Sequence, residues 1–213
     1  MTARQLDPAD SKTGDRSARS GPTAWLIRSL KIAAVSVALV AGSLGAYCGV
    51  IIYEGNVHAI EDGILYRSAQ LGKAGLESVA RQYGIKSVLN LRGANAGSPW
   101  YDNELVEARE LGLAHYDYPL SAKRFVTGRQ IADILDIVRR APKPLLIHCK
   151  SGADRSGLVA AIYEYAITGA SATEADRELS LAYGHFPYLT SRTHAMDDSF
   201  WAFVAGVAPS AAR

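Results

Sequence analysis

The sequence has 213 residues, with 23 basic and 21 acidic side chains, which gives room for one domain of ordinary size and an extension. Six basic and three acidic residues precede residue 32, so the remainder carries 17 basic and 18 acidic residues and no excess of positive charge. This balance excludes a basic nucleic-acid-binding face, and the only two cysteines, Cys48 and Cys149, do not indicate a disulfide framework.

Residues 32–53 form an apolar run without a charged side chain. At a rise of about 1.5 Å per residue, a helix over this run would be roughly 33 Å long, which matches a bilayer core of about 30 Å. We therefore expect a transmembrane helix over 32–53, preceded by a basic cytoplasmic tail over 1–31. A cleaved signal peptide is the alternative, but the run continues through Val50, Ile51 and Ile52 beyond every candidate small-residue cleavage site.

The distribution of charge around the apolar run predicts its orientation. Six basic residues precede the run, whereas the first basic residue after it is Arg67. The positive-inside rule places the N-terminus in the cytoplasm, so in a bacterium the protein would be a single-pass inner-membrane protein with a periplasmic domain. Gly45 and Gly49 have the spacing of a helix-pairing motif, which permits a homodimer without further support from the sequence.

From about residue 56, short apolar runs alternate with amphipathic segments. This alternation predicts an α/β domain over 56–207, with a central, mostly parallel sheet flanked by helices. Gly84 and Gly112 follow the first two expected helices, where a left-handed cap is favoured, and Thr127 is a candidate N-cap of the third. Strands are expected over 64–67, 86–91, 113–120 and 144–148, and helices over 71–83, 101–111, 127–140, 155–168, 172–182 and 196–207.

The expected strand that ends at His148 leads into a tight turn and then into a helix that opens near Arg155. Such an arrangement directs backbone N–H groups and a helix N-terminus into one concavity, which suits a phosphate. A thiol at the start of this turn, Cys149, would be favoured as the nucleophilic thiolate, and the Arg155 guanidinium can bind two phosphoryl oxygens. The expected phosphate-binding residues are Lys150, Ser151, Gly152, Ala153, Asp154, Arg155 and Ser156.

The segment HCKSGADRS, residues 148–156, resembles the signature of the cysteine-based protein tyrosine and dual-specificity phosphatase superfamily: His-Cys, five residues, then Arg and Ser or Thr. LYRSAQ, residues 65–70, is similar to the opening segment of small bacterial and plant members. The resemblance spans about 64–183 and implies a tyrosine-phosphatase-like fold. It also implies a phosphocysteine intermediate on Cys149 and phosphate binding by Arg155. The alternative is a buried structural thiol beside an ordinary helix-opening arginine.

Two aspartates are candidates for the general acid that protonates the leaving oxygen. Asp117 lies 32 residues before Cys149, a spacing that suits the superfamily, but it falls inside an expected strand. Asp154 lies within the loop itself, where some lipid-directed members carry an aspartate, and we favour it; a structural acceptor for loop amides is its alternative role. No metal or cofactor is expected, because the histidines show no metal-ligand spacing.

Three classes of function remain open at this stage. Membrane anchoring and the basic Lys150 favour a phosphatase for an envelope lipid or glycolipid phosphate, with a protein tyrosine or dual-specificity phosphatase acting on phosphoproteins as the alternative. A membrane-tethered pseudophosphatase that only binds phosphate is the second class, and a structural envelope protein is the third. Arg67, Arg92 and Arg124 are candidates for the cleft entrance, but structural ion pairs or solvated charges are the favoured interpretation of each.

Overall fold

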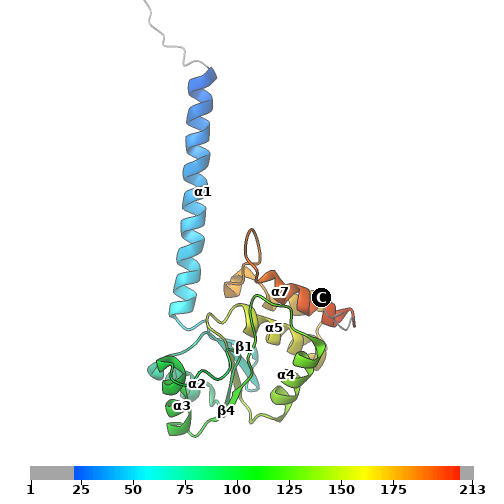
Figure 1. Ribbon diagram of the computed structural model, residues 1–213. Coiled ribbons are helices and arrows are strands. Elements are labelled where there is room, and N and C mark those ends of the chain that lie inside the picture. Colours follow the sequence, from blue (N-terminus) through cyan, green and yellow to red (C-terminus); the bar gives the residue numbers. More distant parts are fainter. Residues whose placement is uncertain (1–21, 207–213) are drawn as a thin grey trace, which may run out of the picture. The chain divides into compact units, whose positions relative to one another are not determined.

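The computed structural model describes residues 22–206. The chain divides into two compact units, the first ending at Leu44 and the second beginning at Gly45. Helix α1 (Pro22–Tyr53) runs across this boundary, and its segment Trp25–Tyr53 is long and apolar enough to cross a membrane (Figure 1). Of the expected cytoplasmic tail, residues 1–21 lie outside the described residues.

The second unit contains a five-stranded sheet in the order β1-β2-β5-β3-β4. Strands β2, β5, β3 and β4 are parallel to their neighbours, whereas β1 is antiparallel to β2. The sheet is therefore mixed and mostly parallel, as expected; β1 was not predicted because its four residues are only half buried and carry two polar side chains. The strands are β1 (His58–Glu61), β2 (Leu65–Ser68), β3 (Ser87–Asn90), β4 (Ala114–Asp117) and β5 (Leu145–His148).

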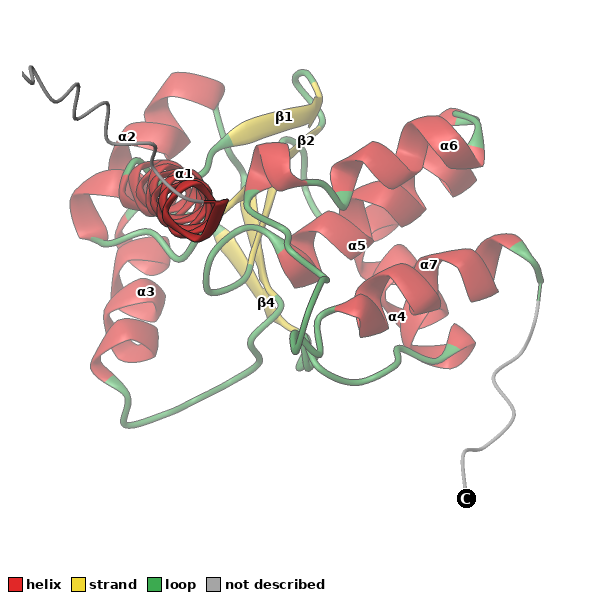
Figure 2. Cartoon of the chain, turned by 90° about the horizontal axis from the view of Figure 1, so that it is seen from above, coloured by secondary structure: helices red, strands yellow, loops and turns green. Residues whose placement is uncertain are grey.

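Helices cover both faces of the sheet (Figure 2). Their bounds are α2 (Lys73–Tyr83), α3 (Pro99–Glu110), α4 (Gly128–Arg140), α5 (Asp154–Tyr163), α6 (Ala172–Ala175) and α7 (His194–Val204). Residues 164–168 extend α5 as a π-helical turn. The helix expected over 172–182 is instead broken into α6 and two 3₁₀ turns, because the backbone carbonyl of Glu178 turns away to accept a hydrogen bond from Arg67.

Alternation along the strands divides the core into two layers. Leu65, Leu145 and Ile147 pack on one face with α4, α5 and α7, and Tyr66 and Leu146 pack on the other face with α2. This two-sided burial explains why the strands are short and continuously apolar in sequence. The expected α/β fold is thus confirmed.

Helix ends follow the local chemistry of the sequence. Gly84 adopts φ 64° after α2, and its N–H donates to the carbonyl of Ala80. Thr127 caps α4, with its side chain accepting from the Gln130 N–H and the Gln130 side chain accepting in return. These capping predictions are confirmed, and such a capping box contributes about 1 kcal/mol to helix stability.

The strand order places β5 between β2 and β3, so three parallel strands end together at one edge of the sheet. His148, the last residue of β5, lies opposite Ser68 on β2 and Asn90 on β3, and Asn90 pairs in turn with Asp117 on β4. This row of polar residues marks the carboxyl edge, which is where ligands bind in open α/β sheets.

A buried ion pair joins β2 to the segment after α6. The Arg67 side chain is fully buried, and its guanidinium forms a hydrogen-bonded ion pair with the Glu178 carboxylate. The same guanidinium lies 4.2 Å from the centroid of the Tyr183 ring. Arg67 is therefore a structural ion pair, the role favoured from the sequence.

We predict that Arg67→Met destabilises the protein by about 3–5 kcal/mol, because it leaves the Glu178 carboxylate buried without its partner. The melting temperature of the detergent-solubilised chain should fall by roughly 10 °C or more. The double variant Arg67→Met/Glu178→Met should be more stable than Arg67→Met alone. Arg81→Met, which breaks the exposed pair with Glu77, is the control and should cost at most about 1 kcal/mol. Equal destabilisation by Arg67→Met and Arg81→Met would contradict the assignment.

Candidate active site

The backbone of the loop after β5 is held from outside through its carbonyl oxygens. Four consecutive carbonyls, those of residues 150–153, accept hydrogen bonds from donors on the preceding segments. The donors are the Gln70 N–H to Lys150 O (3.2 Å), Asn56 Nδ2 to Ser151 O (2.9 Å) and Arg67 Nη2 to Gly152 O (2.7 Å) and Ala153 O (3.0 Å). In a trans peptide the N–H points opposite to the preceding carbonyl, so the N–H groups of 151–154 face the other side. Together they form a cradle for an anion.

Gly152 is required by the shape of this loop. Its φ of +74° lies in the left-handed region, and a Cβ there would come within 2.7 Å of the Ala69 backbone nitrogen and 2.8 Å of the Ser68 carbonyl carbon. Both contacts are with backbone atoms, which cannot move aside as a side chain can. Only glycine fits, so strand β2 is packed directly against the loop.

Cys149 lies at the base of the loop, where its side chain is almost completely buried. Its Sγ is 3.5 Å from Ser156 Oγ. Burial alone raises the pKa of the Cys149 thiol, but the Arg155 charge and the hydrogen bonds from Ser156 outweigh burial and lower the pKa overall. The site therefore favours the thiolate, the nucleophilic form of cysteine.

Two guanidinium groups lie beside the cradle. Arg155 Nη1 donates to the carbonyl oxygen of Leu120 at 3.3 Å, which leaves other N–H groups of the fork for an anion. The Arg92 guanidinium lies 3.4 Å from the centroid of the Trp100 ring and donates to Gln70 Oε1 at 3.1 Å. The pKa of Arg92 is lowered, first by burial and then by the positive charge of Arg155. The two guanidinium groups are therefore close enough to repel each other. Arg92 is also close enough to Cys149 for their charges to interact, whereas Arg124 is an exposed charge.

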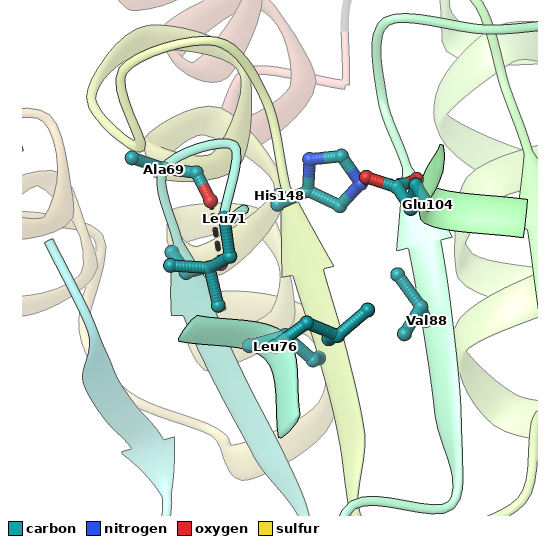
Figure 3. A pocket seen from close by; sticks show the side chains of 8 residues that line it. Ala69, Leu71, Leu76, Val88, Glu104 and His148 are labelled. Carbon is teal, nitrogen blue, oxygen red and sulfur yellow. Dashed lines mark hydrogen bonds and ion pairs between the residues drawn. The ribbon is translucent and has the colours of Figure 1, made fainter. Parts of the chain in front are cut away.

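A buried carboxylate fixes His148, the residue before the cysteine. His148 Nε2 is 3.1 Å and His115 Nε2 is 2.8 Å from Glu104 Oε1, and the Gln70 amide also donates to this carboxylate. Burial raises the pKa of Glu104, but these three hydrogen bonds outweigh it and lower the pKa to about 2. Figure 3 shows the His148 ring directed at Glu104; both line a small pocket whose other lining residues are mostly apolar. Glu104 stays ionised and fixes the loop from its base.

The structure gives the two candidate acids different surroundings. Asp117 accepts hydrogen bonds on both oxygens, from Asn90 Nδ2 at 2.8 Å and from the Tyr101 hydroxyl at 2.6 Å. Asp154 is the first residue of α5, and its Oδ1 is 2.8 Å from His185 Nδ1. Asp154 is also close enough to Cys149 for its charge to oppose the thiolate.

Three residues that hold the site were not found from the sequence. Asn56 precedes β1, Glu104 lies in the middle of α3, and His185 lies in a turn between α6 and α7. Each is an isolated polar residue outside any recognisable motif. Its hydrogen-bond partner in the site lies between 30 and 100 residues away in the sequence. No local pattern in the sequence signals any of them.

We predict that iodoacetate alkylates Cys149 with a half-maximal pH below that of an ordinary thiol such as free cysteine measured alongside it, because the pKa of Cys149 is lowered. Arg155→Met should move this midpoint upward, because Arg155 is the main group that offsets burial. Peptide mass spectrometry would follow Cys149 as a function of pH. Arg124→Met, on the exposed loop before α4, is the control and should leave the midpoint unchanged. A midpoint insensitive to Arg155→Met would refute this account of the thiolate.

Comparison with known proteins places this loop in a family. The model of the tyrosine phosphatase family matches residues 49–175, more than half of the chain. Among curated proteins, none matches the sequence significantly.

Several solved structures have the same fold. TpbA from P. aeruginosa is 19% identical, with 71% of this chain and 91% of that chain covered and a TM-score of 0.51. The core catalytic domain of the PP-IP phosphatase SIW14 from S. cerevisiae is 20% identical, with 71% and 91% covered and a TM-score of 0.54. PTPMT1 is 15% identical, with 70% and 97% covered and a TM-score of 0.53. The chain belongs to the tyrosine phosphatase family and is a cysteine-dependent phosphatase of the protein tyrosine phosphatase superfamily.

Proposed function

We propose that this phosphatase hydrolyses phosphomonoesters through a phosphocysteine intermediate on Cys149. The observation that carries the proposal is that the loop carbonyls of residues 150–153 all accept hydrogen bonds from other segments. In trans peptides this directs the N–H groups of residues 151–154 to the opposite side, where they can bind a phosphate. Arg155 adds the positive charge that offsets charge growing on the phosphoryl oxygens in the transition state. A pseudophosphatase would not need a thiol with a lowered pKa.

In the proposed first step, the Cys149 thiolate attacks phosphorus while the bond from phosphorus to the leaving oxygen breaks. Asp154, in its protonated form, donates a proton to that oxygen, and the Ser156 hydroxyl remains near the sulfur to stabilise it. In the second step, water attacks phosphorus and the S–P bond breaks. Asp154 then accepts the proton of the water, which returns the acid and the thiolate to their starting forms.

Asp154 is preferred to Asp117 as the acid on the contacts that each makes. Both oxygens of Asp117 are occupied by Asn90 and Tyr101, and the hydrogen bond with Asp117 raises the pKa of Tyr101 to about 12. Asp154 keeps one oxygen without such a bond and lies in the loop itself. Asp117 is then a structural acceptor at the end of β4.

The proposed substrate is an envelope lipid or glycolipid phosphate, with a phosphoprotein as the alternative. Lys150 is exposed next to Cys149, and Arg92 lies near Arg155, so the entrance offers two cations beyond the one that binds the reacting phosphate. Such an entrance suits a ligand that carries a second anionic group. The related structures include a PP-IP phosphatase, SIW14, and a TpbA variant in complex with pTyr, so an inositol phosphate and a phosphotyrosyl peptide both belong in the test.

The apolar helix α1 supports a location at the bacterial inner membrane, where a lipid substrate is concentrated. In this proposal residues 32–53 anchor the domain over 56–207, and the excess of basic residues before residue 32 favours a periplasmic domain. An alkaline phosphatase or green fluorescent protein fusion at the C-terminus distinguishes the two orientations.

We predict that the purified full-length chain releases phosphate from an aryl phosphate, and that Cys149→Ser binds the ester without turnover because its hydroxyl is a far weaker nucleophile. After rapid acid quench, mass spectrometry should find phosphate on Cys149 of the wild type. A panel of a phosphotyrosyl peptide, an inositol phosphate, phosphatidylglycerophosphate and lipid A phosphate then identifies the substrate class. Wild-type activity no higher than that of Cys149→Ser would eliminate the enzyme mechanism.

Lys150→Ala tests the preference for a second anionic group. The variant should lower kcat/KM for a substrate with two phosphates about tenfold more than for an aryl phosphate, since one charge-assisted hydrogen bond contributes roughly 1.5–3 kcal/mol. Lys86→Ala, an exposed lysine just before β3, is the matched control. A phosphotyrosyl peptide as the best substrate, with no selective effect of Lys150→Ala, would favour the phosphoprotein alternative.

A further inference from the structure

His185 is a buried histidine held between two carboxylates that come from different helices. Its side chain is fully buried; Nδ1 is 2.8 Å from Asp154 Oδ1 on α5, and Nε2 is 2.9 Å from Asp197 Oδ2 on α7. A carboxylate can only accept a hydrogen bond, so both ring nitrogens satisfy their partners only when both carry a proton. The geometry therefore selects the imidazolium form.

The two carboxylates that contact His185 favour that form. Burial lowers the pKa of His185, but the hydrogen bonds to Asp154 and Asp197 outweigh burial and raise the pKa to about 9. Asp176, in the 3₁₀ turn after α6, is the third carboxylate near the ring, and its own pKa is raised by burial and by the charge of Asp197. His185 thus retains its second proton through the neutral pH range.

His185 can reach a bound ester only through Asp154. The Asp154 side chain keeps 20% of its surface exposed, whereas the His185 side chain keeps none. Asp154 begins α5 at the end of the loop, next to Arg155. The histidine is therefore fully buried and contacts a carboxylate that is itself partly exposed.

We propose that His185 is a positioning residue that orients Asp154 and stores the proton which Asp154 delivers to the leaving oxygen. The proposal rests on the proposed function, in which Asp154 is the acid. It explains how an aspartate next to a buried cation serves as an acid at neutral pH: Asp154 and His185 share one transferable proton, and the pair retains it up to the pH at which the histidine deprotonates.

Each proton that His185 gives up in the first step is returned to it in the second. As the P–O bond breaks and the S–P bond forms, the Nδ1 proton passes to the Asp154 carboxyl group, which delivers it to the leaving oxygen. His185 is then a neutral imidazole that still donates Nε2–H to Asp197, and Asp154 is a carboxylate. When water attacks the phosphocysteine and the S–P bond breaks, the water proton passes through Asp154 back to Nδ1.

The test compares two esters on the full-length chain, phenyl phosphate, whose leaving group needs protonation, and p-nitrophenyl phosphate, whose leaving group needs little. In the wild type, the ratio of the phenyl rate to the nitrophenyl rate should persist through neutral pH and fall as the pH rises through about 9. In His185→Asn, the side-chain amide can still donate a hydrogen bond to Asp154, but it cannot give up a proton for transfer to the leaving oxygen. Its ratio at pH 7 should be about 10–100 times lower than that of the wild type, a loss that reaches the lower end of the roughly 10²–10⁴-fold contribution of general acid catalysis.

Asp197→Asn provides a second, independent test. It removes one of the charges that hold the imidazolium, so the fall in the ratio should move to lower pH. Asp198→Asn, an exposed neighbour on α7, is the matched control and should keep the wild-type profile. If His185→Asn fails to fold, the Asp197→Asn profile decides alone.

Three outcomes would overturn the proposal: a His185→Asn ratio equal to that of the wild type, an equal loss of both rates with an unchanged pH profile, or an Asp197→Asn profile that does not move. The first two indicate a purely structural histidine. Failure of the proposed function is recognised separately, because Cys149→Ser would then be as active as the wild type on both esters.

Discussion

The site depends on one buried cation, the guanidinium of Arg67. It donates to the carbonyl oxygens of Gly152 and Ala153 and to the backbone and carboxylate of Glu178. Turning those carbonyls toward Arg67 turns the following N–H groups toward the cradle, so the same contacts that stabilise the fold create the positive potential in front of Cys149. The cost of desolvating Arg67 is offset only because four acceptors surround it. A lysine, with three donors on a flexible chain, could not replace this planar fork.

Arg67 also explains the close packing of β2 on the loop. The guanidinium reaches the loop from the strand next to β5, and at Gly152 the backbone of residues 68–69 approaches within contact distance. Glycine permits that approach, and Asn56 then adds a hydrogen bond to Ser151 O. Glu104 fixes the other end of the loop through His148. The loop is therefore positioned before any ligand arrives, which reduces the reorganisation needed in the transition state.

The parts of this arrangement that depend on neighbouring residues in the sequence could be predicted. Apolar strands, the caps at Gly84 and Thr127, and the Cys149-to-Arg155 spacing are local features, and each gave the correct fold or family. What could not be predicted depends on contacts between distant segments. The segment 172–182 has helical periodicity, but Arg67 draws the Glu178 carbonyl out of the helix. The roles of Glu104 and His185 depend on which side chains meet after the sheet has formed, and that information is not local.

The distribution of charge around the loop follows from opposite demands on its two ends. The positive charge of Arg155 favours the Cys149 thiolate, whereas the negative charge of Asp154 opposes it. A proton donor is nevertheless needed within reach of the same phosphorus. In the proposed mechanism, imidazolium His185 beside Asp154 meets both needs, since it compensates the carboxylate near the thiolate and keeps a proton within one hydrogen bond of the proposed acid. Asp197 then balances the histidine on the side away from the substrate. Charges of alternating sign thus run from Asp154 through buried His185 to Asp197, whose side chain is partly exposed.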